Sequence, residues 1–247
     1  MWYKLKRILI HPGWVEKQVR PSGWQPWANT VAYRPLTEDV NDYSNSHNWT
    51  NHGVTFSSWQ AIQDVGYFNG SSYISVPNST DFFWSKVFTI SFWMKSTGIW
   101  SIAWDIVDKW NDNQANCVCT RLWYRSDIRG LYTFITRDNS ASYTWIDILN
   151  SWLLDGNWHN VVSTFDNGVS TVYIDNTQVW YVDNSSHTFD FASNTSPLFI
   201  GVDITSWGGV NEYYYIWYLS NVIIENKAWT STEKWDYFNL TKWNYWL

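Results

Sequence analysis

The chain has very few cysteines, and this scarcity excludes several architectures. Only Cys117 and Cys119 occur among the 247 residues, so there is neither a disulfide framework nor a zinc-ligand pattern in the sequence. Two residues spaced i, i+2 on a strand lie on the same face, which is an unusual geometry for a disulfide. We therefore expect two ordinary thiols.

Long apolar runs and a basic body are also missing. No run of 18 apolar residues occurs, so we expect no membrane span. Residues 1–35 contain six Lys or Arg and one Glu, a balance of +5, and the net charge of −6 leaves −11 for the remainder. An acidic body argues against nucleic acid as a partner. The apolar stretch within residues 1–10 is too short and too charged for a convincing signal peptide.

Glycine is scarce and tryptophan is abundant. The chain has 12 Gly and 22 Trp, whereas glycine usually makes up roughly 7% of a protein. Several of the tryptophans stand in segments that resemble turns, where the backbone often needs glycine. This excess needs either a special use for the aromatic rings or an explanation in the genetic code.

Four of the six prolines lie in residues 1–35. Together with the positive charge, they predict an extended arm that precedes the folded domain. Such an arm is either a solvated tail or an attachment segment, for example an added edge strand. We expect a domain boundary there, with the folded domain over residues 36–247.

From residue 36 onward, short apolar runs alternate with polar turn clusters, which is the pattern of an antiparallel sandwich. In 87–96 (VFTISFWMKS), Phe88, Ile90, Phe92 and Met94 share one face. Hairpin turns are expected at 166–168 (DNG) and 175–176 (DN). One short helix is expected near the C-terminus, where Thr230 and Glu233 fit a capping box. The predicted core residues are Phe88, Ile90, Phe92, Trp158, Val162, Val172, Ile174, Val222 and Ile224.

Six segments in this order resemble the laminin-G-like branch of the concanavalin A-like jelly rolls, the lectin/glucanase superfamily. They are 33–56, 67–79 (YFNGSSYISVPNS), 88–96, 155–179 (DGNWHNVVSTFDNGVSTVYIDNTQV), 197–203 (PLFIGVD) and 218–233 (YLSNVIIENKAWTSTE). The resemblance implies an all-β, antiparallel jelly-roll β-sandwich with one short C-terminal helix. It covers most of residues 33–240.

The chain departs from the family pattern at several tryptophans. The pattern has glycine where this chain carries Trp49, Trp110, Trp180 and Trp217, and Trp152 is a fifth candidate. Trp93 and Trp158 instead match family aromatics. We hypothesise that many of these codons are UGA, read as glycine by some bacterial lineages and their phages. The alternative is an aromatic-rich surface evolved to bind sugar.

The superfamily includes glucanases, whose active strand carries Glu-x-Asp-x-x-Glu. The segment that comes nearest to this motif is 144–151 (TWIDILNS), where Asp147 matches the middle carboxylate. Trp145 and Asn150 stand where the two Glu are needed, and neither can donate a proton or attack an anomeric carbon. We therefore expect no catalytic residues and no enzyme activity.

Relatives often hold a structural calcium ion at the rim of the sandwich through oxygen ligands. Asp39, Asn41 and Asp42 form an acidic loop that resembles the family's first motif. The family's later Asp-Glu pair is Ser220-Asn221 here, which removes two carboxylates. Calcium is accordingly an expectation rather than a requirement, and no other cofactor is expected.

Sugar binding requires aromatic faces for pyranose C–H surfaces, with polar groups that fix hydroxyls. The candidate ligand-binding residues are Trp123, Tyr124, Tyr143, Trp145, Trp207, Tyr213 and Tyr214. The alternative for any one of these aromatics is a structural strand residue or a misread glycine.

These observations predict a non-catalytic module that binds a glycan or another surface ligand. We expect it outside the cell, on a cell surface or in a phage virion, with virion or surface-protein subunits as further partners. The alternatives are a purely structural virion or cell-surface protein and, least favoured, a glucanase-like glycoside hydrolase.

Overall fold

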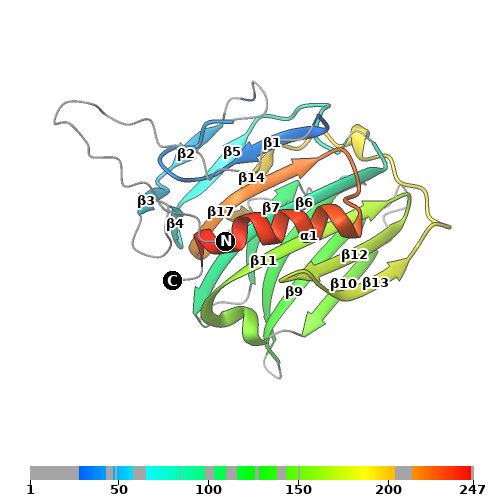
Figure 1. Ribbon diagram of the computed structural model, residues 1–247. Coiled ribbons are helices and arrows are strands. Elements are labelled where there is room, and N and C mark those ends of the chain that lie inside the picture. The colour runs from blue at the N-terminus through cyan, green and yellow to red at the C-terminus, as the bar shows by residue number, and fades with distance from the viewer. Residues whose placement is uncertain are drawn as a thin grey trace, which may run out of the picture.

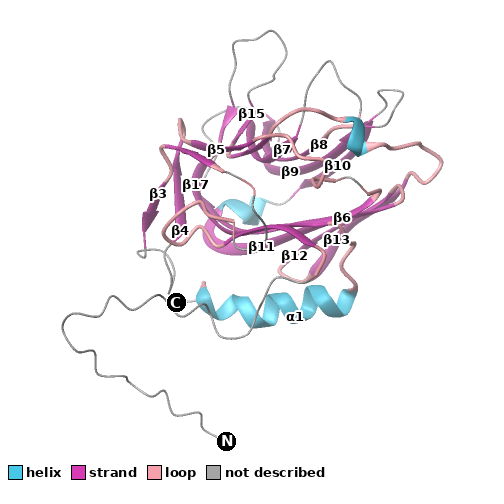
Figure 2. Ribbon diagram, turned by 90° about the horizontal axis from the view of Figure 1, so that it is seen from above, coloured by secondary structure: helices cyan, strands magenta, loops and turns pink. Residues whose placement is uncertain are grey.

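The computed structural model describes residues 28–42, 47, 49–57, 65–83, 85–97, 103–109, 116–125, 128–137, 143–149, 151–203 and 213–245. These residues form two antiparallel sheets that face each other (Figures 1 and 2). The predicted all-β jelly-roll sandwich with one short C-terminal helix is confirmed. In the described part of the chain, no helix is long and apolar enough to cross a bilayer.

The eight-stranded sheet has the order β13-β12-β11-β6-β17-β4-β3, and β1 also pairs with β17. Strand β1 falls within the segment predicted to be an arm, and residues 1–27 lie outside the described part. The strand bounds are β1 (Thr30–Arg34), β3 (Thr55–Ser57), β4 (Val65–Asn69), β6 (Val87–Thr97), β11 (Asp155–Asp166), β12 (Val169–Ile174), β13 (Thr177–Asp183) and β17 (Ile216–Glu225).

The seven-stranded sheet has the order β10-β9-β8-β7-β14-β5-β2. A separate two-stranded sheet, β15-β16, packs against β7. The bounds are β2 (Thr50–His52), β5 (Tyr73–Val76), β7 (Ala103–Lys109), β8 (Val118–Arg125), β9 (Ile128–Arg137), β10 (Tyr143–Leu149), β14 (Leu198–Ile200), β15 (Val202–Asp203) and β16 (Tyr213–Tyr214). Three 3₁₀ turns cover Ser151–Leu154, Phe191–Ser193 and Lys242–Asn244.

The main core lies between the two sheets. Strand β6 shows how the sequence builds it, because Phe88, Ile90, Phe92 and Met94 alternate inward and are all fully buried. All nine predicted core residues are buried. Seven of them belong to this inter-sheet core, whereas Trp158 and Val162 belong to a second apolar layer.

The second layer lies between the eight-stranded sheet and helix α1 (Ser231–Thr241), which runs across the outer face of that sheet (Figure 2). Trp93 points away from the main core yet is fully buried here, and its Nε1 donates to Thr241 Oγ1 at 3.1 Å. The predicted capping box is present, because the Glu233 amide donates to Thr230 Oγ1 at 3.2 Å and the Glu233 carboxylate accepts from the Thr230 amide. One outer face of the sandwich is thus occupied by α1.

Both predicted hairpin turns are also present. Asn167 and Gly168 have φ of 48° and 96° between β11 and β12, and Asp175 and Asn176 have φ of 48° and 64° between β12 and β13. Positive φ at both central residues is the requirement of a type I′ turn, which Asn, Asp and Gly meet at least cost.

The tryptophans suspected of replacing glycine have different environments. Trp217, at the start of β17, has φ of 106°, and its buried Nε1 has no hydrogen-bond partner among the described residues. The buried Nε1 of Trp49 likewise has none there, and Trp180 is 43% exposed on edge strand β13. Trp110 and the side chain of Trp152 lie outside the described part. The φ of Trp217 is the conformation that the glycine hypothesis expects at this position.

Trp217→Gly is expected to stabilise the domain by about 1–2 kcal/mol. A positive φ costs a residue with a Cβ roughly 1–3 kcal/mol, and a buried N–H without an acceptor costs about as much. The lost burial of a partly buried ring offsets about half of that sum. Urea unfolding of the wild type, Trp217→Gly and Trp217→Ala measures the change. The alanine variant keeps the Cβ, so equal stability of both variants would show that backbone strain is absent.

Candidate functional site

The outer face of the seven-stranded sheet lies on the opposite side of the sandwich from α1 (Figure 2). Alternation along its strands sends one set of side chains into the core and the other set to this outer face. In β5, Ile74 and Val76 are buried in the core, whereas Tyr73 and Ser75 are partly exposed. The outer face therefore presents chemistry that the inter-sheet core does not use.

Aromatic side chains gather there into a group that we call the tyrosine patch: His52, Tyr73, Phe199 and Tyr214. The ring of Tyr73 stacks on His52 with centroids 4.1 Å apart and planes 8° apart. Its centroid lies 6.1 Å from that of Tyr214 and 6.3 Å from that of Phe199. His52, Tyr73 and Tyr214 are partly exposed, so ring surface is available to a ligand.

Hydroxyl groups lie beside this patch. Strand β2 pairs with β5, which places Thr50 opposite Ser75 and His52 opposite Tyr73. The Ser75 Oγ lies 2.8 Å from His52 Nε2. Stacking surface and hydrogen-bonding groups therefore occur together, which is the combination that sugar recognition uses.

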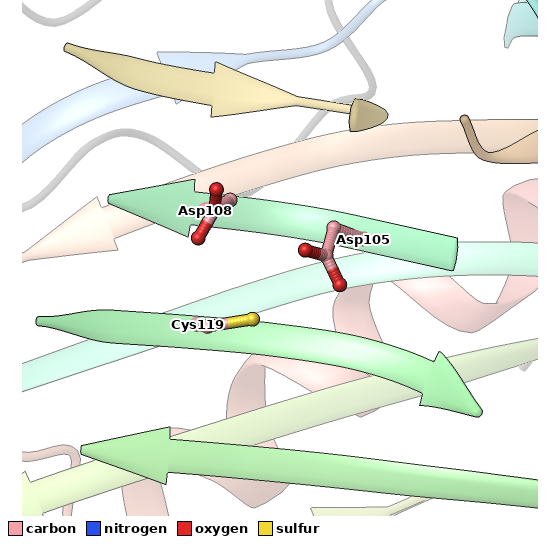
Figure 3. Close-up of side chains that lie close together, drawn as sticks. All are labelled: Asp105, Asp108 and Cys119. Atoms are coloured by element: carbon pink, nitrogen blue, oxygen red, sulfur yellow. The ribbon is translucent and has the colours of Figure 1, made fainter. Parts of the chain in front are cut away.

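A buried charged cluster lies on the central strands of the same sheet. Arg121 on β8 donates from Nη2 to Asp105 Oδ2 at 2.9 Å, and the same Nη2 lies 3.3 Å from Asp203 Oδ2. The Arg121 Nε lies 2.7 Å from Asp105 Oδ1 in the same ion pair. Asp108 on β7 stands opposite Cys119 on β8. We refer to Asp105, Asp108, Cys119, Arg121 and Asp203 as the acidic cluster. Figure 3 shows how three of its members lie.

A β-bulge brings the two β7 carboxyl groups together. Residues three apart on a regular strand lie on opposite faces. In β7 the pairing register with β8 shifts between Asp105 and Val107, and both Ile106 and Val107 point into the core. The extra residue re-aims the strand, so Asp105 and Asp108 share the outer face.

The cluster is buried, and this changes its acid–base properties. Burial raises the pKa of Asp105 to about 7, because the opposing effect of Arg121 is smaller and Asp203 adds to the rise. Burial also holds the pKa of Asp108 well above its usual range, with Asp105 and Asp203 contributing further. The Cys119 thiol likewise has a raised pKa because it is buried. These groups resist ionisation unless a positive charge compensates them.

The two β7 carboxyl groups do not reproduce the glucanase pair. Their spacing equals that of the last two carboxylates in Glu-x-Asp-x-x-Glu, but Ala103 stands at the first, nucleophilic position. Asp105 and Asp108 are both fully buried, whereas glycosidase carboxylates flank an open groove. Sequence reasoning missed this cluster, although two aspartates in and beside the apolar run AWDIV were a usable signal.

The structure places six of the seven sequence-predicted ligand residues in this sheet or in the adjoining β15-β16 sheet. Tyr214 belongs to the tyrosine patch. Trp123 and Tyr124 lie on β8, Tyr143, Trp145 and Asp147 on β10, and Tyr213 on β16, with only their backbone described. Trp207 lies outside the described residues. The assignment of these residues to ligand binding therefore stays a prediction.

The residues expected to hold calcium make contacts within the protein. The side chain of Asp42 is buried and forms an ion pair with Arg34 at 3.5 Å, and it accepts from the Tyr33 amide at 3.2 Å. Asp39 accepts from the Asn41 amide at 2.8 Å. Arg34 thus supplies positive charge to the Asp42 carboxylate from within the chain. Calcium at Asp39, Asn41 and Asp42 stays a prediction.

A family model described as the concanavalin A-like lectin/glucanases superfamily matches residues 68–233, more than half of the chain. A sequence search against curated proteins gave no match. The sandwich is similar to solved structures at low sequence identity.

One similar structure is the binding domain of Paraclostridial Mosquitocidal Protein 1, with a TM-score of 0.67, 19% identity, and coverage of 85% of this chain and 52% of that one. A second is Domain 4 of AbnA, a GH43 extracellular arabinanase from Geobacillus stearothermophilus, in complex with arabinotriose. Its TM-score is 0.60 at 16% identity, and the match covers 86% of this chain and 98% of that one. A third is the binding domain of Botulinum Neurotoxin DC in complex with SialylT. Its TM-score is 0.63 at 12% identity, and the match covers 86% of this chain and 51% of that one. The chain spans about half the length of the two toxin binding domains. At these identities, the likeness establishes a shared fold.

Proposed function

Since this chain belongs to the concanavalin A-like lectin/glucanase superfamily, we propose that it is a non-catalytic module that binds carbohydrate at the tyrosine patch. The observation that carries the proposal is the set of partly exposed aromatic rings around Tyr73, on the sheet face opposite α1. Aromatic faces take up the C–H surface of a pyranose ring, and such contacts need no ionised catalytic group.

The polar surroundings of the patch support the same proposal. Thr50, Ser75 and His52 offer hydroxyl and imidazole groups beside the rings, and these groups can fix the orientation of sugar hydroxyls. The comparison structures add support at the level of the fold, because two of them are described as complexes with arabinotriose and SialylT. Their ligands guide which sugars to test first, namely arabino-oligosaccharides and sialylated glycans.

Alanine substitution of Tyr73 tests the proposal. We expect the wild type to bind selected members of a glycan array, and Tyr73→Ala to weaken that binding about tenfold, because one ring contact contributes roughly 1 kcal/mol or more. Titration calorimetry with the best array glycan gives the two affinities. Tyr181→Ala is the matched control, because Tyr181 is 56% exposed on edge strand β13 of the other sheet. Equal affinity of Tyr73→Ala and the wild type would place binding elsewhere.

A second function has a separate observation in its favour. Trp235, Leu240 and Trp243, in and just after α1, are 56%, 49% and 62% exposed, and large exposed apolar surface is typical of protein contacts. They favour a structural role in which this face packs on a neighbouring subunit of a virion or cell surface. A purely structural protein would bind no glycan on the array. For either role we propose a secreted or surface location.

A further inference from the structure

The acidic cluster brings three buried carboxyl groups together around Arg121. Asp105, Asp108 and Asp203 are three buried carboxyl groups, and Arg121 forms ion pairs with two of them, Asp105 and Asp203. The Lys109 ammonium, next to Asp108 in sequence, donates instead to Asn78, Asn194 and Ser196. A buried charge without a partner costs several kcal/mol, so protons or a bound cation must complete the balance.

Asp108 is the carboxyl group of the cluster that forms no ion pair with Arg121. Its side chain is fully buried, and among the described residues the donor beside its carboxylate is the Cys119 thiol, which is a weak one. Asp105 and Asp203 differ, because both carboxylates contact Arg121. Buried polar groups in native proteins are nearly always satisfied, so the carboxylate of Asp108 has capacity for a further ligand.

Three groups of different chemistry converge beside Asp108. A carboxylate oxygen of Asp105, one of Asp108 and the Sγ of Cys119 all lie within 4.8 Å of one another (Figure 3). Ligands that share one tetrahedral ion at about 2.0–2.3 Å are themselves about 3.3–3.8 Å apart. The observed spacing is therefore within a small side-chain rotation of a coordination site.

We propose that Asp105, Asp108 and Cys119 bind one zinc-class divalent cation on the outer face of the seven-stranded sheet. The thiol selects this class, because calcium and magnesium take oxygen ligands whereas a Cys thiolate favours zinc. The two positive charges of the ion offset most of the negative charge of the two β7 carboxylates and the thiolate, which ionises on coordination and releases its proton. The site is independent of the tyrosine patch, and carbohydrate binding is not needed for it.

An ion bound at this site would also stabilise the fold. An ion held between Asp105 and Asp108 on β7 and Cys119 on β8 would bridge the two paired strands at the register shift. A ligand that binds only the folded chain stabilises it by mass action. Zinc should therefore raise the midpoint of thermal unfolding.

The test begins with the full chain expressed in medium supplemented with ZnCl2, because the buried site fills most readily during folding. After desalting, inductively coupled plasma mass spectrometry is expected to find one zinc ion per chain in the wild type. Asp108→Asn and Cys119→Ser should each lose at least nine-tenths of it. Cys117→Ser is the matched control, because Cys117 is equally buried but lies outside the cluster, and it should keep its zinc.

Growth with CoCl2 supplies a spectroscopic test of the ligand set. The wild type and Cys117→Ser should show thiolate-to-cobalt charge-transfer absorption, and Cys119→Ser should lack it. Far-UV circular dichroism confirms that each variant is folded. A wild type without bound zinc would overturn the proposal, as would zinc or cobalt spectra that Cys119→Ser leaves unchanged. Protons would then balance the cluster.

Discussion

Arg34→Met is expected to destabilise the domain by about 3–5 kcal/mol, the usual cost of removing one partner from a buried ion pair. Arg34 is fully buried on β1, and its Nη2 lies 3.5 Å from Asp42 and donates to the His47 carbonyl at 3.2 Å. Its guanidinium carbon lies 3.7 Å from the ring centroid of Trp49. Methionine fills similar space but removes the guanidinium that pairs with the buried Asp42 carboxylate.

Urea unfolding of the wild type and Arg34→Met measures this loss. The double variant Arg34→Met/Asp42→Asn is the control, because it also removes the stranded carboxylate charge. It should recover a large part of the stability. If the double variant is as unstable as the single one, packing rather than charge accounts for the role of Arg34.

Lys109→Met is expected to cost about 2 kcal/mol of unfolding free energy, because methionine has no donor and each of the two buried carbonyls that lose their partner costs roughly 1 kcal/mol or more. The Lys109 Nζ donates to Asn78 Oδ1 and to the carbonyls of Asn194 and Ser196, each at 2.8 Å. The bonds to Asn194 and Ser196 tie β7 to the segment that precedes β14.

Thermal and urea unfolding of Lys109→Met check this value. Lys86→Met is the matched control, because Lys86 is exposed just before β6, and it should change stability by less than about 0.5 kcal/mol. A wild-type-like Lys109→Met would mean that the three oxygens find other donors in the folded chain.

Local patterns predicted the elements that depend on neighbours in sequence. The alternation in 87–96 identified the inward face of β6, and the DNG and DN turns identified two hairpins because their positive φ needs particular residues. Thr230 and Glu233 identified the start of α1 for the same reason. Each of these features is decided within a few residues.

Features that depend on long-range pairing could not be predicted in this way. The tyrosine patch joins β2, β5, β14 and β16, which meet only after the sheet forms. The acidic cluster depends on a bulge that overrides the two-residue period of β7, so a regular strand would have placed Asp105 and Asp108 on opposite faces. The sequence analysis named Tyr214 as a ligand-binding candidate on its aromatic character alone. It did not name Tyr73, whose ring lies between those of His52 and Tyr214.

The most direct test of carbohydrate binding is a crystal structure of the chain with the glycan that binds most tightly on the array. The proposed function predicts a sugar ring packed against Tyr73 or Tyr214 on the outer face of the seven-stranded sheet, with polar contacts near Thr50, Ser75 and His52. A sugar bound on the α1 face or at the β13 edge, or a chain that binds no glycan at all, would contradict it.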